Sequence, residues 1–205
     1  MTHIAEPDTD ETAGAEYPAS PARKVPGEVG IWVFILGDIS VFTYIFVVYL
    51  IYRRDHLELF QQSREYLSQN LGVANTLVLL FSSLFVIRAG RAFRGGDARS
   101  GPRWFAAALV CGLLFVAFKS IEYHGEIAAG HTLNANVFFN FYFLMTALHL
   151  THLVIGLVVL VYLFAISRRT QHSKWHTTAI EGGSCYWHMV DFLWIIIFAL
   201  LYLIR

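Results

Sequence analysis

The sequence is poor in charged residues and in cysteine. Only 15% of its 205 residues are Asp, Glu, Lys or Arg, against about 25% in a typical soluble domain. The formal net charge at pH 7 is zero, so the chain lacks the basic surplus by which nucleic-acid-binding proteins are recognised. Hydrophobic residues reach 56% and aromatic residues 16%. This composition indicates a membrane protein.

The two cysteines, Cys111 and Cys185, are too few and too far apart for a redox or zinc motif. Neither belongs to a CxxC pair, and both fall within or at the edge of an apolar stretch. We interpret them as small packed thiols rather than as a disulfide or a metal site.

Motifs for independent chemistry are also missing. The sequence has no nucleotide-binding loop, no nucleophile beside a base and no heme-ligand pattern. His149 and His152 are spaced i, i+3, which supplies only two ligands, with no third nearby in the sequence. We therefore expect packing and interhelical hydrogen bonds from these histidines, no metal or cofactor on this chain, and no catalysis by the chain alone.

Residues 1–26 lack the basic segment and apolar core of a targeting peptide. They are rich in Pro, Thr, Ala and acidic residues, which predicts a disordered tail. The domain proper is predicted over 27–205, with the first membrane helix acting as its own insertion signal.

Five long apolar stretches make up most of the domain. Each approaches or exceeds the roughly 20 residues that cross a bilayer, which predicts helices over about 29–52, 71–93, 103–127, 137–166 and 182–204. Continuous apolar runs exclude a barrel, whose strands would alternate. The predicted fold class is all-α, an integral membrane bundle of five transmembrane helices.

Basic residues predict the orientation of this bundle. They are more frequent in the N-terminal tail and in the second and fourth loops than on the opposite side. The positive-inside rule then places the N-terminus in the cytoplasm and the C-terminus outside.

Four ionisable residues within or near the spans are candidate proton-active groups: Asp38, Glu122, His188 and Asp191. Such groups cost several kcal/mol in lipid unless they face protein or water. His188 and Asp191 share a helix face, and Asp38 is predicted at a similar depth. His188 and Asp191 are interpreted first as a structural pair and second as a proton relay. In a shared polar cluster, we hypothesise that His188 lies between the two carboxylates. Asp38 has a second interpretation, a carboxylate tied to a neighbouring helix by hydrogen bonds. Glu122 is expected near the outer face, solvated or paired with Lys119.

Structural roles are predicted for other polar, aromatic and small residues of the spans. Trp187, Asp191 and Trp194 are spaced i, i+4, i+7 and form a stripe on the last helix. Asn75 is an uncharged polar residue of the second span. Three glycines are predicted helix-contact positions, namely Gly72, Gly112 and Gly156.

Taken in order, several motifs resemble subunit III of the heme–copper oxidases over residues 27–205. The last helix carries the most specific one, Tyr-Trp-His-Met-Val-Asp at 186–191 followed by Trp194. The others are Gly30 to Phe42, Asn75-Thr76 with Ser82-Ser83, Glu122-Tyr123, Phe138-Phe139, the segment 148–156 with His149, His152 and Gly156, and Glu181.

This resemblance implies a non-catalytic subunit of a respiratory complex in a bacterial inner membrane. Its partner would be the catalytic subunit of a heme–copper oxidase or nitric oxide reductase, which would hold the heme and metal, and a bound phospholipid is compatible with it. Asp38 stands where the family has a glutamate linked to proton uptake. Many family members have seven helices, and this chain lacks the first two.

Within the family, the chain is most similar to the NorE-type accessory branch associated with nitric oxide reductases. The short length, the Pro26-Gly27-Glu28 start, the Gly37-Asp38 pair and the Leu-Leu-Tyr-Leu-Ile-Arg end carry this resemblance. An ordinary subunit III of a cytochrome c or quinol oxidase is the first alternative.

Two alternatives come from other functional classes. A small proton-coupled transporter could use Asp38 with His188 and Asp191, but the sequence shows no inverted repeat and no helix broken in mid-span. A histidine–metal membrane enzyme is disfavoured because most of the nine histidines lie in predicted loops and in the tail.

Overall fold

The computed structural model describes residues 29–97, 99–133, 135–169 and 174–204. The predicted disordered tail, residues 1–26, lies outside the described residues.

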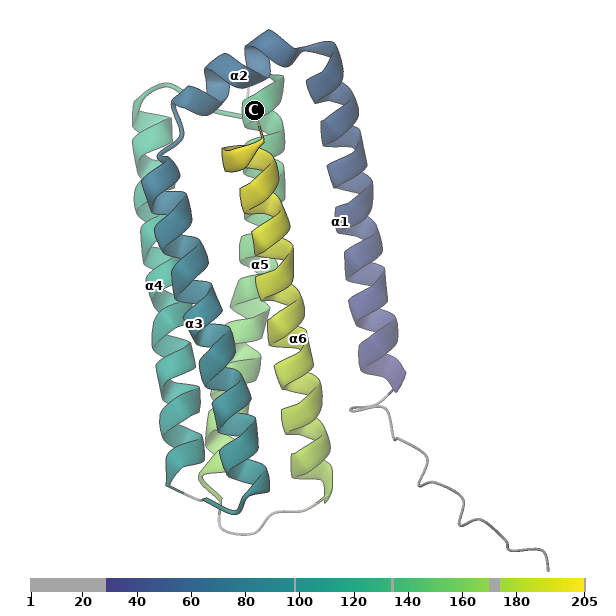
Figure 1. The fold of residues 1–205 in the computed structure, drawn as a ribbon, viewed down its shortest axis with the longest axis vertical. Helices are drawn as coiled ribbons and strands as arrows, with labels where there is room; N and C mark the ends of the chain where they lie inside the picture. Colours follow the sequence, from purple (N-terminus) through teal and green to yellow (C-terminus); the bar gives the residue numbers. More distant parts are fainter. Residues whose placement is uncertain (1–28, 98, 134, 170–173, 205) are drawn as a thin grey trace, which may run out of the picture.

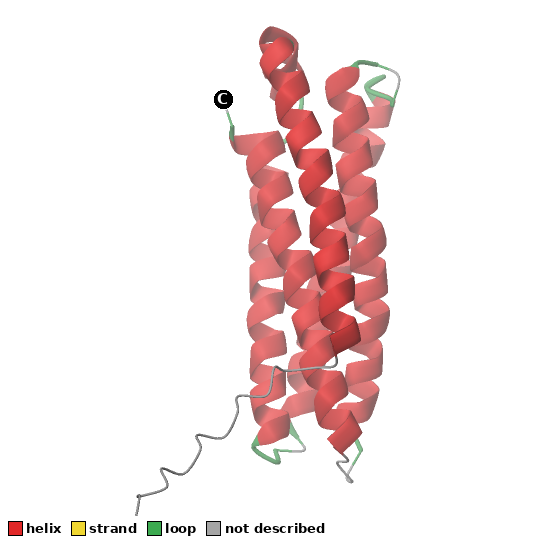
Figure 2. Ribbon diagram, turned by 90° about the vertical axis from the view of Figure 1, so that its right-hand side faces the viewer, coloured by secondary structure: helices red, strands yellow, loops and turns green. Residues whose placement is uncertain are grey.

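Five long helices run roughly parallel or antiparallel to one another (Figures 1 and 2). They are α1 (Val29–Asp55), α3 (Gln69–Arg94), α4 (Ser100–Ala128), α5 (Val137–Ser167) and α6 (Lys174–Phe198). A short π-helix, η1 (Ala199–Leu203), continues α6. The described residues contain no strand, and all five helices are long and apolar enough to cross a membrane. The prediction of an all-α bundle of five transmembrane helices is confirmed.

Polar caps begin some of these helices. The Asn136 side chain accepts a hydrogen bond of 3.0 Å from the backbone N–H of Phe139 at the start of α5. Before α4, the Asp97 carboxylate accepts from the backbone N–H groups of Arg99 and Ser100. Hydrogen bonds from Ser100 lower the pKa of Asp97, which keeps this cap ionised at neutral pH.

Two features of the helices differ from the sequence prediction. The sequence prediction did not include α2 (Leu57–Glu65). This polar helix of 9 residues crosses the bundle end between α1 and α3 (Figure 1). It buries Phe60 and Ser63. Helix α6 begins at Lys174 rather than near residue 182, because its polar first turns stay helical outside the apolar run. Hydropathy marks the lipid-embedded part of a helix, whereas backbone hydrogen bonding sets its ends.

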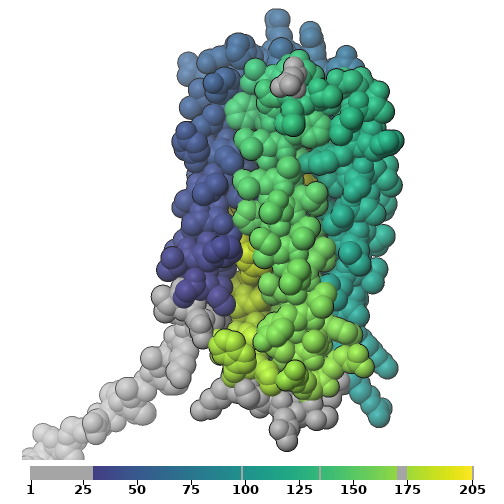
Figure 3. Space-filling view, turned by 180° about the vertical axis from the view of Figure 1, so that it is seen from behind, coloured from purple at the N-terminus to yellow at the C-terminus, as the bar shows by residue number. Residues whose placement is uncertain are grey.

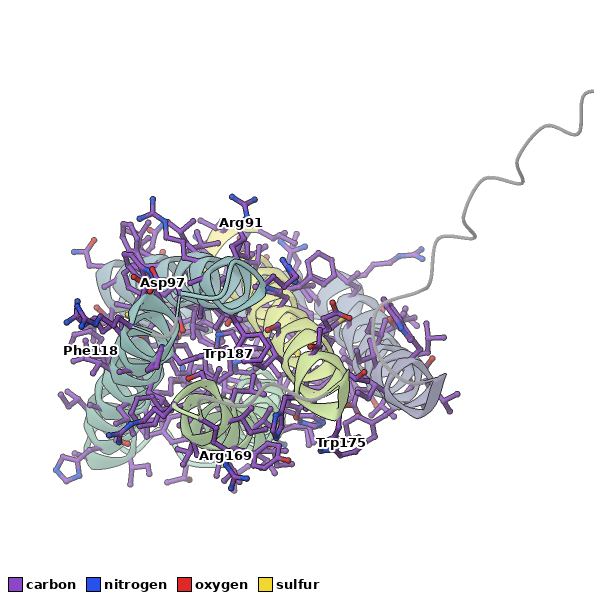
Figure 4. All side chains as sticks on the ribbon, turned by 90° about the horizontal axis from the view of Figure 1, so that it is seen from below. Arg91, Asp97, Phe118, Arg169, Trp175 and Trp187 are labelled. Carbon is purple, nitrogen blue, oxygen red and sulfur yellow. The ribbon has the colours of Figure 1, made fainter. Side chains whose placement is uncertain are left out.

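Helix α6 is the most enclosed element. In its most apolar stretch 67% of the residues are buried, against 17% in α1. It packs against α1, α3 and α5, and seen from below it lies among the other helices with Trp187 inside the bundle (Figure 4).

Trp187 is seated between two glycines of neighbouring helices. An added Cβ would lie 3.0 Å from the Trp187 ring at Gly112 of α4 and 2.9 Å from it at Gly156 of α5. At Gly72 of α3 it would lie 2.8 Å from the Phe198 ring. The three predicted helix-contact glycines are therefore confirmed, since each lets an aromatic ring of α6 approach a backbone closely.

Replacing Gly156 by alanine tests the packing of the Trp187 ring against this glycine. We expect Gly156→Ala to lower the free energy of unfolding by about 1–3 kcal/mol, because the new methyl group overpacks a rigid indole ring. Gly125→Ala is the matched control. Its Cβ meets open space on α4, so the change should raise stability by up to about 1 kcal/mol. Denaturant titration in detergent micelles measures both, and equal effects would refute the packing role of Gly156.

Candidate functional site

Three groups of polar residues lie within the spans, which we call the α1–α5 pair, the α3–α6 site and the lysine cluster. The α1–α5 pair consists of Asp38 and His152. The α3–α6 site consists of Ser83, His188 and Asp191. The lysine cluster consists of Lys119, Glu122, Tyr142 and Tyr202.

In the α1–α5 pair, Nε2 of His152 lies 3.4 Å from Oδ1 of Asp38. The other ring nitrogen, Nδ1, lies 2.8 Å from the Leu148 carbonyl oxygen, so Nδ1 carries a hydrogen and donates it. Nε2 can then accept from a protonated Asp38, or donate to an ionised Asp38 when the ring is charged. The contact between the two side chains therefore links α1 to α5.

Two aromatic residues hold His152 in this position. The Phe42 ring of α1 meets the imidazole edge-on, with centroids 5.4 Å apart. The Tyr186 hydroxyl of α6 donates to the His152 carbonyl oxygen at 3.1 Å. The interhelical contact expected of His152 is thus confirmed, and Asp38 is tied to a neighbouring helix.

In the α3–α6 site, Nδ1 of His188 lies 2.6 Å from the Ser83 hydroxyl oxygen. Asp191 lies one turn further along α6. It is buried, and neither carboxylate oxygen has a hydrogen-bond partner. A buried carboxylate without a partner costs several kcal/mol, which makes Asp191 a candidate functional group.

The hypothesis that His188 lies between Asp38 and Asp191 is wrong. His188 contacts α3, whereas Asp38 contacts α5. Position along a helix gives the depth of a residue in the membrane, but it does not say which neighbouring helix the residue faces.

Aromatic rings pack around the centre of the bundle between these sites. His149 is fully buried with its ring 5.7 Å from that of Phe115 and 5.2 Å from that of Trp194. Neither ring nitrogen of His149 has a hydrogen-bond partner. The interhelical hydrogen bond expected of His149 is therefore wrong, and only its packing role is confirmed. The Trp194 indole N–H donates to the Thr76 hydroxyl at 3.1 Å.

Two further residues of this region carry unused hydrogen-bonding groups. Asn75 of α3 is fully buried, and neither atom of its side-chain amide has a hydrogen-bond partner. The Trp187 indole N–H is buried in the same way. The stripe predicted on α6 is confirmed as an inward face, since Trp187, Asp191 and Trp194 are all buried.

The lysine cluster lies in the half of the bundle nearer α2. Nζ of Lys119 donates to the hydroxyls of Tyr142 and Tyr202 at 3.1 Å each, and it lies 3.2 Å from Oε1 of Glu122. The same carboxylate oxygen accepts from both tyrosine hydroxyls. The Trp194 ring lies 5.3 Å from the ammonium group, within the range of cation–π attraction.

The predicted pairing of Glu122 with Lys119 is confirmed, but solvation of Glu122 is wrong. Glu122 is only 4% exposed and Lys119 only 1%. Both residues lie on the inward face of α4, and tyrosines from α5 and η1 cover them. The i, i+3 spacing of acid and base gave a signal for the pair. No local signal pointed to Tyr142 or Tyr202, which come from other helices.

Among the described residues, no three His, Cys, Asp or Glu side chains are grouped closely enough to hold a metal ion. The chemistry that the three sites offer is proton binding and hydrogen bonding.

Breaking the lysine cluster on one side should destabilise the bundle strongly. Lys119→Met leaves the Glu122 carboxylate buried without its cation, which costs about 3–5 kcal/mol. Adding Glu122→Gln removes that charge, so the double variant should be more stable than the sum of the single changes predicts. Unfolding of the four proteins in detergent gives the coupling. Additive effects would show that the two side chains do not interact.

The sequence of this chain is similar to those of known proteins. The family model described as cytochrome c oxidase subunit III matches residues 22–204. Cytochrome c oxidase subunit 3 of Thermostichus vulcanus is 29% identical over 199 residues, covering 96% of this chain and 97% of the relative. Probable cytochrome c oxidase subunit 3 of Mycobacterium leprae is 30% identical over 177 residues, covering 86% and 87%. The same subunit of Bacillus sp. (strain PS3) is 25% identical over 206 residues, covering 98% and 97%.

Proposed function

Since the chain belongs to the cytochrome c oxidase subunit III family, we propose that it is a non-catalytic membrane subunit of a heme–copper oxidoreductase complex in a respiratory chain. It binds the catalytic subunit, stabilises it and shapes proton or gas access to it. The observation that carries this function is the family match over residues 22–204, which includes the whole described bundle. The heme and metal belong to the partner subunit.

The outer surface of the bundle supports a role within membrane and protein contacts. The exposed large hydrophobic residues include Val33, Leu36 and Tyr44 of α1. A hollow of about 410 Å³ lies between α1, α5 and α6, where α6 is visible behind the other two helices (Figure 3). Its lining is almost wholly apolar and includes Phe34, Val159 and Ala179. The acyl chain of a phospholipid is the ligand we propose for this hollow.

For the catalytic partner, we propose a nitric oxide reductase of the NorE-associated type. The Gly37-Asp38 pair and the Leu-Leu-Tyr-Leu-Ile-Arg end support this choice. The chain length does not support a nitric oxide reductase partner, because two relatives named cytochrome c oxidase subunit 3 are matched over 97% of their own length. An oxidase partner is the alternative that those names favour.

We also propose the bacterial inner membrane as the location, with the N-terminus in the cytoplasm. The bundle end that carries the α3–α4 loop is then the cytoplasmic one. Arg91, Arg94 and Arg99 are grouped there, as the positive-inside rule requires of a cytoplasmic loop.

A pull-down of the tagged chain from native membranes in mild detergent tests this function. We expect a catalytic heme–copper subunit to copurify, identified by mass spectrometry and by a heme absorption spectrum. A nitric oxide reductase subunit would support the NorE-type proposal, and an oxidase with its copper-binding subunit would replace it. Recovery of the chain alone, without heme, would contradict the accessory-subunit function and make proton transport the next assay.

The contact between Asp38 and His152 in the α1–α5 pair leads to a prediction on turnover. Asp38→Asn keeps the shape of the side chain but cannot take up a proton, so we expect slower turnover of the purified complex. The loss should stay below the roughly 100-fold of a group that transfers a proton in the reaction itself. Asp38→Glu should restore most of the rate, and Ser40→Ala, on the exposed side of α1, is the control. Unchanged turnover in Asp38→Asn would leave Asp38 with a structural role only.

A further inference from the structure

Four polar residues of α6 lie along one line. Glu181, Ser184, His188 and Asp191 are spaced i, i+3, i+7 and i+10, which keeps them on one side of a helix and spans about 15 Å of its length. The line begins near the bundle end that carries the α3–α4 loop and ends inside the bundle. A polar line of this kind among apolar neighbours needs protein or water partners along its length.

A cavity of about 350 Å³ between α3 and α6 follows this line. Glu181, Ser184, Cys185 and His188 line it from α6, and Gly90 and Arg94 are among its lining residues from α3. Glu181 and Arg94 lie at its outer end, with Oε1 and Nη1 3.9 Å apart and both side chains partly exposed. The mouth of the cavity is thus charged, whereas the hollow between α1, α5 and α6 is apolar.

Unsatisfied polar groups lie deeper along the same line. The Ser184 hydroxyl is buried without a hydrogen-bond partner. His188, at the inner end of the cavity, contacts Ser83 through Nδ1 at 2.6 Å. One turn further, the Asp191 carboxylate is 4% exposed and neither oxygen has a partner. The lining is mostly apolar, but Glu181, Arg94, Ser184 and His188 give it a polar side, and water held along that side can satisfy such groups and connect them.

We propose that this cavity is a hydrated half-channel, which admits protons from the α3–α4 loop end of the bundle to Asp191. Glu181 and Arg94 keep the mouth hydrated, His188 relays the proton, and the Asp191 carboxylate binds it. The step is a proton transfer alone, with no change of oxidation state. The half-channel lies within this chain. In the proposed complex it would supply a proton reservoir beside the catalytic subunit.

Aromatic rings end the path at Asp191. Trp194, one turn further along α6, is fully buried and packs edge-on against Phe115, with centroids 4.7 Å apart. Two titratable groups from other helices lie against the Trp194 ring, Lys119 of α4 at 5.3 Å from its centroid and His149 of α5 at 5.2 Å. Asp38 of α1 is engaged by His152. The path therefore stores a proton and does not carry it across the membrane.

The native cysteines provide the first test. Cys185 lines the cavity, whereas Cys111 lies on α4 away from it. The full chain in lipid nanodiscs is treated with a charged methanethiosulfonate, using Cys111→Ser to report on Cys185 and Cys185→Ser to report on Cys111. Because only a hydrated thiol ionises and reacts, we expect Cys185 to react about tenfold faster than Cys111.

Filling the cavity supplies a matched control. A side chain at Gly90 meets open space and would occupy the cavity, and the same change at Gly125 also meets open space but lies elsewhere. Gly90→Leu should slow the labelling of Cys185 to the rate of Cys111, and Gly125→Leu should leave it unchanged. If the charged reagent modifies Cys185 no faster than Cys111, the cavity holds lipid or is closed, and the proposal fails.

Infrared spectroscopy tests the end of the path. A carboxyl band that Asp191→Asn removes, or that Asp191→Glu shifts, reports the proton on Asp191. Over a range of pH this band should appear and should exchange rapidly in deuterated water, with slower exchange in Gly90→Leu. The absence of an Asp191-dependent band at every pH, or exchange that Gly90→Leu leaves unchanged, would overturn the proposal. Both readouts use the purified chain, so they succeed or fail independently of whether a heme-containing partner copurifies.

Discussion

The seat of Trp187 between Gly112 and Gly156 is the contact on which the rest of the bundle depends. In lipid, apolar side chains gain little by leaving the solvent, so helices associate through close packing and hydrogen bonds. Two glycines from α4 and α5 allow the Trp187 indole of α6 to approach both backbones. Helix α6 is thereby fixed at the centre of the bundle, where most of its apolar stretch is buried.

This central position brings the polar sites within reach of α6. Tyr186 donates to the His152 backbone beside the α1–α5 pair, His188 and Asp191 belong to the α3–α6 site, and Tyr202 of the following η1 donates to Glu122 in the lysine cluster. Each group faces protein instead of lipid, which lowers the cost of placing it at membrane depth. The three sites involve different helices, and Trp194 packs against Phe115 and His149 at the centre of the bundle. Such an arrangement suits a subunit that supports a catalytic partner.

The sequence alone predicted the features that depend on local pattern. Hydropathy located the five spans, and helical spacing placed Trp187, Asp191 and Trp194 on one inward face. It failed wherever the partner of a residue comes from a distant segment. Tyr142 and Tyr202 reach Glu122 across 20 and 80 residues of chain, and Asp38 meets His152 rather than His188. Helix α2 was missed because it is short and polar. Depth and face can be read from periodicity, but neighbouring helices are selected by packing.

We propose that this bundle is a structural and proton-handling subunit whose redox chemistry resides in a neighbour. A cryo-electron microscopy map of the complex, isolated through a tag on this chain, tests that claim most directly. The account predicts heme density confined to an adjacent catalytic subunit, with α6 enclosed among its own helices and no cofactor density inside them. Heme or metal density within the five-helix bundle, or an assembly without any heme-bearing subunit, would contradict it.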